Sequence, residues 1–526
     1  MRSSLFVLVA LCHATVAFKL LVYLPAMGRS HVNFLGALAD ILVDQGHDVV
    51  ALMPMYDTSI GSVGTKKARI IKVPQSEGAR LYQEHNEQAS GMISNVWKST
   101  SILDMHSSLK EMGSSLADQC NYTLNHPNLL QQLKDEHFDV AFGEVMDLCG
   151  FGIFNVLGLE NLVVAHSAGT FEKFAITGVP SFPSYVPGHM SATSDRMTFL
   201  ERTKNAASAP VARVLLSHLL LGPIYDIFDR RYPHLPKGDD LTNNTSLIFI
   251  NAEPLIDFPR ITAHKIIEIG GITASSAHKP LNSTWSAILS LRPRTVLLSF
   301  GSLVKSHLMP EDYKQNIRNT FKKFPEVTFI WKYEKPEHKI SEGIDNIIES
   351  TWVPQIDMLN DPRLSVFITH CGAGSTMEAM IAGKSLIVIP AMGDQIRNAQ
   401  LVKRAGTGYV LEKADLGSIS KLEEALREVL YDERYANAAN RTAELIKHRP
   451  FEMKDVFIRN MEFVARFGPL TMLDHYGRQM SFISYYLLDV FAFFAILILT
   501  ASVVSFFLIR LLVRFIFRSD TKKKVQ

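Results

Sequence analysis

A glycine-rich turn, THCGAGS at residues 369–375, carries the densest chemical signal in the sequence. A strand-like run, LSVFI, leads into the turn, and a helical pattern, TMEAMIAG, follows it. Glycines at such a turn let backbone amides approach an anion, and the positive end of the following helix attracts phosphate. The turn therefore predicts a phosphate site, for which pyrophosphate is the natural ligand.

Side chains near this turn could hold the other parts of a nucleotide. His370 can donate to a phosphate oxygen, and Glu378 offers a carboxylate that can accept from both hydroxyls of a ribose. Trp352 gives a flat face for a nucleobase, and Gln355 could read the polar edge of that base. A glycine-rich turn alone can serve tight packing only, but its combination with these four side chains favours a nucleotide site.

A second candidate for chemistry is His31, which follows Gly28-Arg29-Ser30 between a predicted strand and its helix. An imidazole can take a proton near neutral pH and act as general base on a hydroxyl. A structural cap at a helix start is the simpler alternative. A base of this type usually needs a carboxylate partner, and both Glu144 and Asp147 follow the predicted strand at 138–142. We prefer Glu144 and keep Asp147 as the alternative; either could be a solvated loop carboxylate.

The segment from 352 to 395 closely resembles the signature of the UDP-glycosyltransferases of the glucuronosyltransferase type, including the membrane-bound animal enzymes. The matching motifs are WVPQ at 352–355, FITHCGAGSTMEA at 367–379, Pro390, and Gly393-Asp394-Gln395. The resemblance extends over nearly the whole chain. It implies inverting transfer of a sugar from a UDP-sugar to a hydroxyl of a small lipophilic acceptor, with His31 as base, Glu144 as its partner and no metal.

The resemblance also implies roles for individual residues. Trp352 would stack on uracil and Gln355 would contact the uridine. Glu378 would hold the ribose, and Asp394 with Gln395 the sugar hydroxyls. The diphosphate would be held by residues of two turns: Ser302, His370, Gly372, Gly374 and Ser375.

Two positions depart from the family pattern. Cys371 stands where Gly is common, and Gly374 stands where many vertebrate members have Asn. The second change would lose one polar contact near the phosphates and sugar. Glucuronic acid and glucose therefore both stay open as the transferred sugar.

The composition excludes other classes. A formal net charge of +2, with dispersed Lys and Arg, gives no footprint for nucleic acid. No grouping of His, Cys and carboxylates has ligand spacing, so we expect no metal and no cofactor besides the UDP-sugar as co-substrate. A non-catalytic lumenal binder of lipophiles that keeps a UDP pocket is the alternative function, although His31 and its carboxylate are both present. A homo-oligomer is neither predicted nor excluded.

The elements that must position these residues are strands and helices in alternation. Strand-like and helical runs alternate at 19–25, 32–43 and 48–53, and the pattern begins afresh in the second half. Alternation of this kind predicts open parallel sheets, and thus an α/β fold. We expect two doubly wound Rossmann-like domains of the GT-B type facing across a cleft: an N-terminal acceptor-binding domain at 18–275 and a C-terminal UDP-sugar-binding domain at 276–450.

Two segments fit this pattern less well. Residues 178–236 follow neither period cleanly, so we expect loops and short helices inserted in the first domain. Such an insertion could line the acceptor pocket, pack on the domain or touch a membrane. Residues 451–482 look helical, and we expect them to connect the second domain to a membrane span.

The two ends of the chain predict a membrane protein. Residues 1–17 combine one basic residue, an apolar run and small residues in a pattern typical of a signal peptide. Residues 490–509 are uncharged over about the 20 residues that a spanning helix needs. The basic tail at 510–526 would lie in the cytosol and the two domains in the lumen. Because the last residues, KKVQ, resemble a dilysine signal, we predict a single-pass type I protein of the endoplasmic reticulum membrane.

Lumenal placement bears on asparagines and cysteines. Acceptor tripeptides for N-glycosylation stand at Asn121, Asn243, Asn244, Asn282 and Asn440. Three cysteines remain after removal of the signal peptide, so we expect no disulfide framework. Cys120 and Cys149 could pair or stay free.

Overall fold

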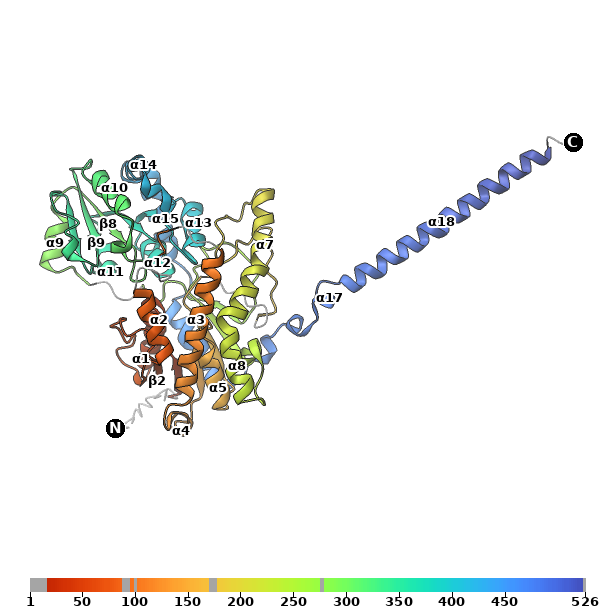
Figure 1. Cartoon of the computed structure of the whole chain (residues 1–526), viewed down its shortest axis with the longest axis horizontal. Helices are drawn as coiled ribbons and strands as arrows, with labels where there is room; N and C mark the ends of the chain where they lie inside the picture. Colours follow the sequence, from red (N-terminus) through yellow and green to blue (C-terminus); the bar gives the residue numbers. More distant parts are fainter. Residues whose placement is uncertain (1–16, 88–94, 99–101, 170–176, 275–278, 524–526) are drawn as a thin grey trace, which may run out of the picture.

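The computed structural model describes residues 17–87, 95–98, 102–169, 177–274 and 279–523. Two parallel α/β domains face each other, and one long helix extends away from them (Figure 1). The predicted fold class is therefore confirmed. Most of the predicted signal peptide lies outside the described residues.

The first domain is built on a seven-stranded parallel sheet in the order β3-β2-β1-β4-β5-β6-β7. Its topological switch point lies between the central strands β1 and β4, where the chain reverses its direction of winding. The strands are β1 Lys19–Tyr23, β2 Asp48–Pro54, β3 Arg69–Val73, β4 Val140–Gly143, β5 Leu162–His166, β6 Thr245–Ile250 and β7 Ile266–Glu268.

The second domain repeats the design with six parallel strands in the order β10-β9-β8-β11-β12-β13. Here the switch point lies between β8 and β11. The strands are β8 Arg294–Ser299, β9 Val327–Lys332, β10 Ile347–Ser350, β11 Leu364–Thr369, β12 Ser385–Val388 and β13 Gly408–Val410. Ligands of such sheets bind beyond the carboxyl ends of the strands at the switch point. The topology therefore predicts one binding edge in each domain, next to its switch point.

Each sheet buries both faces, as expected where helices cover a parallel sheet on both sides. In β1, Leu21 and Tyr23 belong to one apolar cluster, whereas Leu20 and Val22 belong to the cluster on the other face. This alternation follows the two-residue period of a strand. The sheets are thus rigid platforms for the loops at their edges.

Helices of the first domain include one departure from the sequence prediction. Instead of loops and short helices, residues 199–231 form a nearly continuous helical run: α7 Phe199–Leu215, a π-helical stretch Leu216–Leu221 and α8 Gly222–Arg231. Pro210 inside α7 and the Gly-Pro pair at the start of α8 hide this run from pattern analysis. The other helices are α1 Arg29–Asp44, α2 Glu77–Glu87, α3 Ile102–Leu124, α4 Leu129–Asp135 and α5 Cys149–Val156.

A disulfide between Cys120 and Cys149 joins α3 to α5, and Cys371 is a buried free thiol. The open choice between paired and free cysteines is thereby decided. The helices of the second domain are α9 Ser283–Leu289, α10 Glu311–Phe321, α11 Gln355–Leu359, α12 Ala373–Ile381, α13 Gln395–Ala405, α14 Ile419–Tyr431 and α15 Glu433–Lys447.

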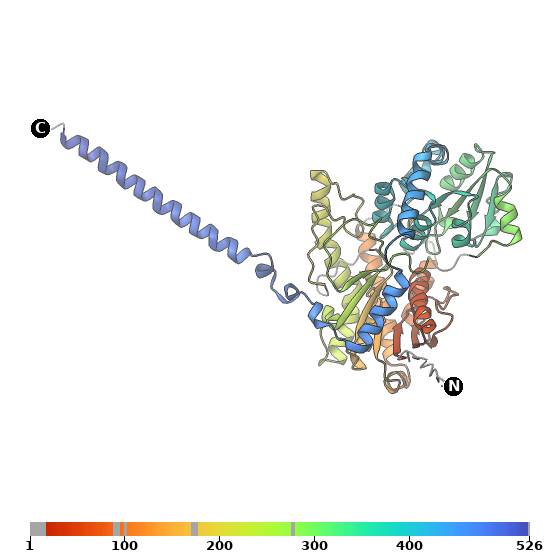
Figure 2. The same cartoon turned by 180° about the vertical axis from the view of Figure 1, so that it is seen from behind.

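The segment after the second domain returns to the first. Helix α16, Met453–Phe467, packs on the first sheet (Figure 2). The rings of Phe457 in α16 and Phe249 in β6 have centroids 4.9 Å apart. Met461 and Val464 extend the same contact in the core of the first domain. This stretch, which we expected only to connect, therefore belongs to the packing of the first domain.

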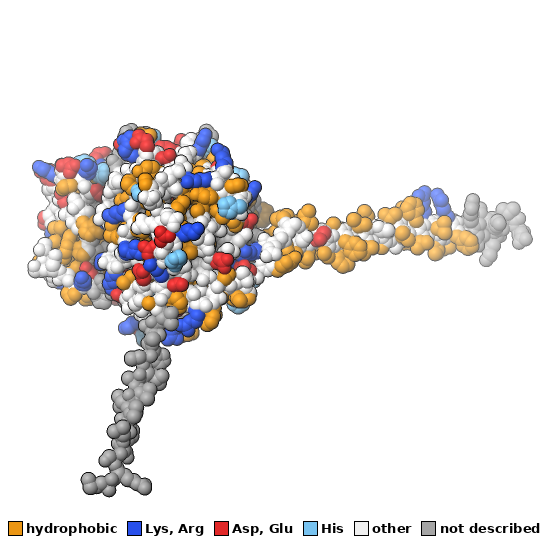
Figure 3. All heavy atoms as spheres, turned by 90° about the horizontal axis from the view of Figure 1, so that it is seen from below, with side chains coloured by type: hydrophobic (Ala, Val, Ile, Leu, Met, Phe, Trp, Pro, Cys, Tyr) orange, Lys and Arg blue, Asp and Glu red, His pale blue; other side chains and the backbone are white. Residues whose placement is uncertain are grey.

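Beyond the short helix α17, Phe482–Tyr485, the chain continues as helix α18, Leu488–Lys523. Its part from Leu488 to Ile516 is long and apolar enough to cross a membrane, and none of its most apolar window is buried by the protein. Figure 3 shows apolar side chains along the visible length of this helix. The predicted span at 490–509 lies inside it.

Candidate active site

A cavity of about 2420 Å³ lies between the two domains. From the first domain it is lined by the β1–α1 turn with His31, and by Met112 of α3. From the second domain it is lined by Ser302, Trp352 and Gly393. Of the predicted site residues, His31, Ser302 and Trp352 line this cavity, so one residue predicted for acceptor chemistry and two predicted for donor binding face one space.

His31 and Glu144 are in direct contact at the edge of the first sheet. The Nδ1 atom of His31 lies 2.7 Å from Oε2 of Glu144. His31 stands in the first turn of α1 after β1, and Glu144 follows β4, so the two sides of the switch point supply the pair. A carboxylate only accepts hydrogen bonds, so Nδ1 carries the hydrogen and Nε2 is left as the basic nitrogen.

Two residues at the end of the next strand complete this group, and sequence analysis missed both. The Ser167 hydroxyl donates to Oε1 of Glu144 over 2.7 Å and lies 2.9 Å from Nδ1 of His31. Nδ1 of His166 lies 3.2 Å from the same carboxylate oxygen. A polar His-Ser pair at 166–167, one residue after the strand-like run at 161–164, was the signal available in the sequence.

The charges of this group reinforce one another. Burial lowers the pKa of His31, but the charge and hydrogen bond of Glu144, with the charge of Asp394, outweigh burial and raise the pKa above its ordinary value of 6.5. Burial acts to raise the pKa of Glu144, but the charges and hydrogen bonds of His31 and His166 hold it well below its usual range. The pair is thus a carboxylate beside a strengthened base.

Asp147, the alternative partner, has other contacts. It accepts hydrogen bonds from the Tyr23 hydroxyl at 2.8 Å and from the Cys149 amide at 2.9 Å. Burial raises the pKa of this carboxyl to about 6. Asp147 therefore supports the start of α5, and the structure joins Glu144, not Asp147, to His31.

His370 lies at the switch point of the second sheet, wedged between two glycines. A Cβ atom at Gly301 would come within 2.7 Å of its ring, and so would a Cβ atom at Gly372. The Oγ1 atom of Thr369 lies 3.3 Å from Nδ1 of His370. Burial lowers the pKa of His370 to about 4. A neutral imidazole in this place can donate one hydrogen bond without bringing a charge.

Helix α12 begins directly after His370. Its N-cap, Gly372, makes no side-chain hydrogen bond to the helix, and a Cβ atom at Gly374 would meet open space. The first amides of the helix have no intrahelical partner and no side chain caps them, as an anion site requires. Cys371 has a φ of +67°, a conformation that favours glycine, which explains why Gly suits this position.

Gln355, Ser375 and Glu378 form one hydrogen-bonded group. The Gln355 amide donates to Oγ of Ser375 at 3.0 Å and to Oε2 of Glu378 at 2.7 Å. Burial raises the pKa of Glu378 to about 7, although the bond from Gln355 acts in the opposite direction. Trp352, three residues before Gln355, is 56% exposed and lines the cavity.

Asp394 and Gln395 stand at the start of α13. Asp394 accepts from the Asn398 amide at 2.9 Å. Gln395 is buried, and its Oε1 accepts from the backbone amides of Ala391 and Met392. Gln395 therefore shapes the loop after β12, and only its amide nitrogen is left for a ligand. The charge of Asp394 acts to raise the pKa of both His31 and His370.

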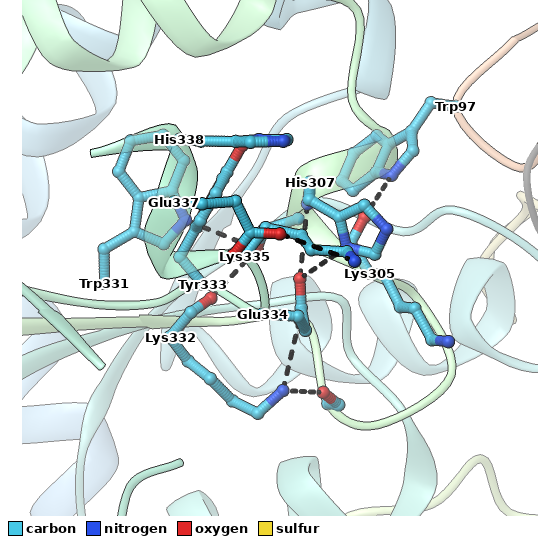
Figure 4. A network of polar contacts seen from close by, with 12 residues as sticks. Trp97, Lys305, His307, Trp331, Lys332, Tyr333, Glu334, Lys335, Glu337 and His338 are labelled. Atoms are coloured by element: carbon cyan, nitrogen blue, oxygen red, sulfur yellow. Dashed lines mark hydrogen bonds and ion pairs between the residues drawn. The ribbon is translucent and has the colours of Figure 1, made fainter. Parts of the chain in front are cut away.

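The turn that carries Ser302 is supported from outside its own domain. Trp97 of the first domain is buried among core residues of the second, stacks edge-on against Phe300 at 4.9 Å and donates to the carbonyl of Lys305 at 3.0 Å. Figure 4 shows this contact beside the network in which His307 and Lys332 both reach Glu334. Lys332 also donates to the Gly301 carbonyl at 2.8 Å, which puts a cation next to Ser302.

Comparison with known proteins decides the family. The model described as "UDP-glucoronosyl and UDP-glucosyl transferase" matches residues 19–525. The chain belongs to this family. UDP-glucuronosyltransferase 1A1 of Homo sapiens is 27% identical to this UDP-glycosyltransferase. The match covers 92% of the present chain and 89% of the human one. The Caenorhabditis elegans protein ugt-47 is 28% identical, over 90% and 89% of the two chains.

Solved structures agree on the fold of this UDP-glycosyltransferase. The glycotransferase of kitacinnamycin has a TM-score of 0.58 and 15% identity, over 86% of this chain and 98% of the other. The spinosyn rhamnosyltransferase SpnG complexed with thymidine diphosphate has a TM-score of 0.56 and 16% identity, over 85% and 100%. Both likenesses bear on the two-domain architecture alone.

The remaining predicted sites of the UDP-glycosyltransferase lie on its surface. Asn121, Asn244, Asn282 and Asn440 are exposed, and Asn243 is half-buried. Glycosylation of these residues stays a prediction. Within the described ranges, no group of three His, Cys, Asp or Glu side chains is placed to hold a metal ion.

Proposed function

We propose that this UDP-glycosyltransferase is an inverting enzyme that moves glucuronic acid or glucose from a UDP-sugar to a hydroxyl of a small lipophilic acceptor. The observation that carries the proposal is the His31–Glu144 contact at 2.7 Å on the wall of the cavity that Trp352 and Ser302 also line. A base held by a carboxylate thus stands opposite a nucleotide platform.

His31 acts as the general base. With Nδ1 occupied by Glu144, Nε2 takes the proton of the acceptor hydroxyl. The acceptor oxygen then attacks the anomeric carbon from the face opposite the diphosphate, a new carbon–oxygen bond forms, and the bond from that carbon to the β-phosphate oxygen breaks. Glu144 stabilises the imidazolium, as the aspartate of a His-Asp pair does.

The second domain binds the donor and stabilises the leaving UDP. Trp352 stacks on uracil, Gln355 contacts the uridine and Glu378 binds the ribose hydroxyls. The negative charge that grows on the diphosphate meets the free amides of α12, the neutral imidazole of His370, Ser302 and Ser375. Asp394 and the amide of Gln395 bind the sugar. The reaction needs no metal, so EDTA should leave turnover unchanged.

The acceptor side of the cavity fits an apolar molecule. Its lining includes methionines and leucines of the first domain: Met105, Met112, Met190, Leu216 and Leu220. Met side chains are flexible and adapt to acceptors of different shape. We further propose that α18 anchors the enzyme in the endoplasmic reticulum membrane with both domains in the lumen, because the basic residues follow the apolar stretch.

Turnover with a panel of donors tests the proposal. Membranes containing the full-length protein are incubated with UDP-glucuronic acid and UDP-glucose together and a mixture of phenols, sterols and bile-acid-like compounds, and products are identified by mass spectrometry. His31→Ala should abolish UDP release, whereas the control His448→Ala, on an exposed helix end, should not. Wild-type protein that binds UDP but turns over no donor would instead indicate a non-catalytic binder of lipophiles.

A further inference from the structure

Arg29 of the first domain rests on the exposed indole of Trp352 in the second. Its guanidinium carbon lies 4.9 Å from the ring centroid. Both side chains line the cavity between the domains. A planar guanidinium that covers an aromatic face is a favourable contact, but here it occupies the surface on which the proposed function places the nucleobase.

A second cation near Trp352 shows what is unusual about Arg29. The Lys332 ammonium lies 5.9 Å from the same indole, and it is fastened by hydrogen bonds to Gly301 and Glu334. Among the residues that the structure describes, Arg29 makes no side-chain hydrogen bond and no ion pair. A guanidinium has five donors and no acceptor, so Arg29 is the cation that can be displaced from the indole and that has donors to offer a ligand.

We propose that Arg29 is a donor-binding residue that stacks on the outer face of the uracil ring, so that the base lies between Trp352 and the guanidinium. This inference rests on the proposed function, because it takes Trp352 to be the uracil platform. The geometry sets a clear requirement. Two contacts of about 3.5 Å each put the guanidinium carbon about 7 Å from the indole, so Arg29 must move outward by about 2 Å when the base enters.

The movement of Arg29 would also affect the turn that carries His31. Arg29 is the first residue of α1, and His31 lies two residues further in the same turn. Trp352 belongs to the second domain, so a uracil ring held between Trp352 and Arg29 would bridge the two domains. This bridge would lie directly beside His31, the proposed general base. Arg29 thus joins occupancy of the nucleotide site to the position of the acceptor half.

Binding of UDP and of uridine to the full-length protein, measured by isothermal titration calorimetry in detergent, tests this role. The variants are Arg29→Gln, Arg29→Lys and Trp352→Ala. Arg196→Gln serves as matched control, because it removes the same charge from the wall of the same cavity. Uridine lacks phosphates, so it reports on contacts with the base and ribose alone.

We expect Arg29→Gln to weaken both UDP and uridine about tenfold, as loss of a desolvated cation–π contact does. Arg29→Lys should retain part of the UDP affinity and little of the uridine affinity, because an ammonium has no plane to stack. Arg196→Gln should change neither by more than about twofold. A tenfold loss confined to UDP would overturn the stacking role, since it would place Arg29 on the phosphates.

The failure of this inference differs from failure of the proposed function. If Trp352→Ala weakens UDP while Arg29→Gln leaves UDP and uridine unchanged, the uracil platform stands and the role of Arg29 is wrong. If Trp352→Ala also leaves UDP binding unchanged, the proposed donor site itself is wrong. In the wild-type protein, a UDP complex should show the guanidinium carbon displaced from the indole by the base between them.

Discussion

Ser167 donates both its amide and its hydroxyl hydrogen to one oxygen of Glu144, over 2.9 and 2.7 Å. The other oxygen of that carboxylate faces His31. Both Glu144 and Ser167 are buried. Glu144 is therefore fixed in orientation by its neighbour, and the tautomer of His31 is fixed in turn.

Ser167→Ala should lower kcat about tenfold with little change in the KM for donor. The variant removes one hydrogen bond to a buried carboxylate, a contact of about 1.5–3 kcal/mol, while the donor domain is untouched. Initial rates at saturating UDP-sugar provide the measurement. Ser420→Ala, on the exposed surface of α14, is the control, and equal rates for both variants would argue against a positioning role of Ser167.

Glu144→Gln should move the pH profile of kcat/KM toward lower pH and lower its plateau. Glu144 raises the pKa of His31 in the wild-type protein, so the base is active only above that raised pKa. Without the charge, His31 deprotonates at lower pH. Its imidazolium is then less stabilised in the transition state, so we expect the plateau of kcat/KM to fall about a hundredfold or more. Rates measured from about pH 5 to about pH 9 show both effects. An inflection that moved upward would contradict the pairing.

UDP-glucose should bind more weakly below neutral pH than above it. The Glu378 carboxyl has a pKa of about 7, so it gains a proton as the pH falls through 7 and can no longer accept from both ribose hydroxyls. UDP-glucose is suitable because its diphosphate does not itself titrate there. Glu378→Gln should bind more weakly and without this pH dependence, and a wild-type affinity that rose on acidification would contradict the role of Glu378.

Trp97→Ala should destabilise the protein and raise the KM for donor. Trp97 is 2% exposed, and removal of a buried Trp costs about 3–5 kcal/mol. Because its indole supports Phe300 and Lys305, the turn that carries Ser302 loses its outer wall. Thermal unfolding and donor kinetics provide the two readouts. Trp97→Phe keeps an apolar ring but loses the hydrogen bond and part of the buried volume, so its effect should be smaller, about 1–3 kcal/mol.

Sequence analysis succeeded where the signal is local. The strand-turn-helix pattern around 369–375 predicts the position of α12, and the strand before Glu144 predicts that its carboxylate reaches the sheet edge. The contacts of Ser167, Trp97 and Arg29 are different, because each partner lies far away in the chain. No periodicity marks such a residue, since only the folded topology brings three strand ends, or two domains, together.

Two other differences concern the local backbone. Cys371 departs from a glycine position, yet the structure gives it the left-handed φ that glycine adopts easily, and its thiol is packed beside Thr376. The helical run at 199–231 contains Pro210, which lowers helix propensity although the packed domain accommodates it. Tertiary packing decides both cases.

The return of α16 to the first sheet makes the second domain an insertion within the first. The chain enters the second domain and comes back before it reaches α18, so a load on α18 is carried by the first domain alone. The second domain therefore has no direct link along the chain to α18. If α18 lies in a membrane, as we propose, we expect the second domain to move relative to the first without moving that helix.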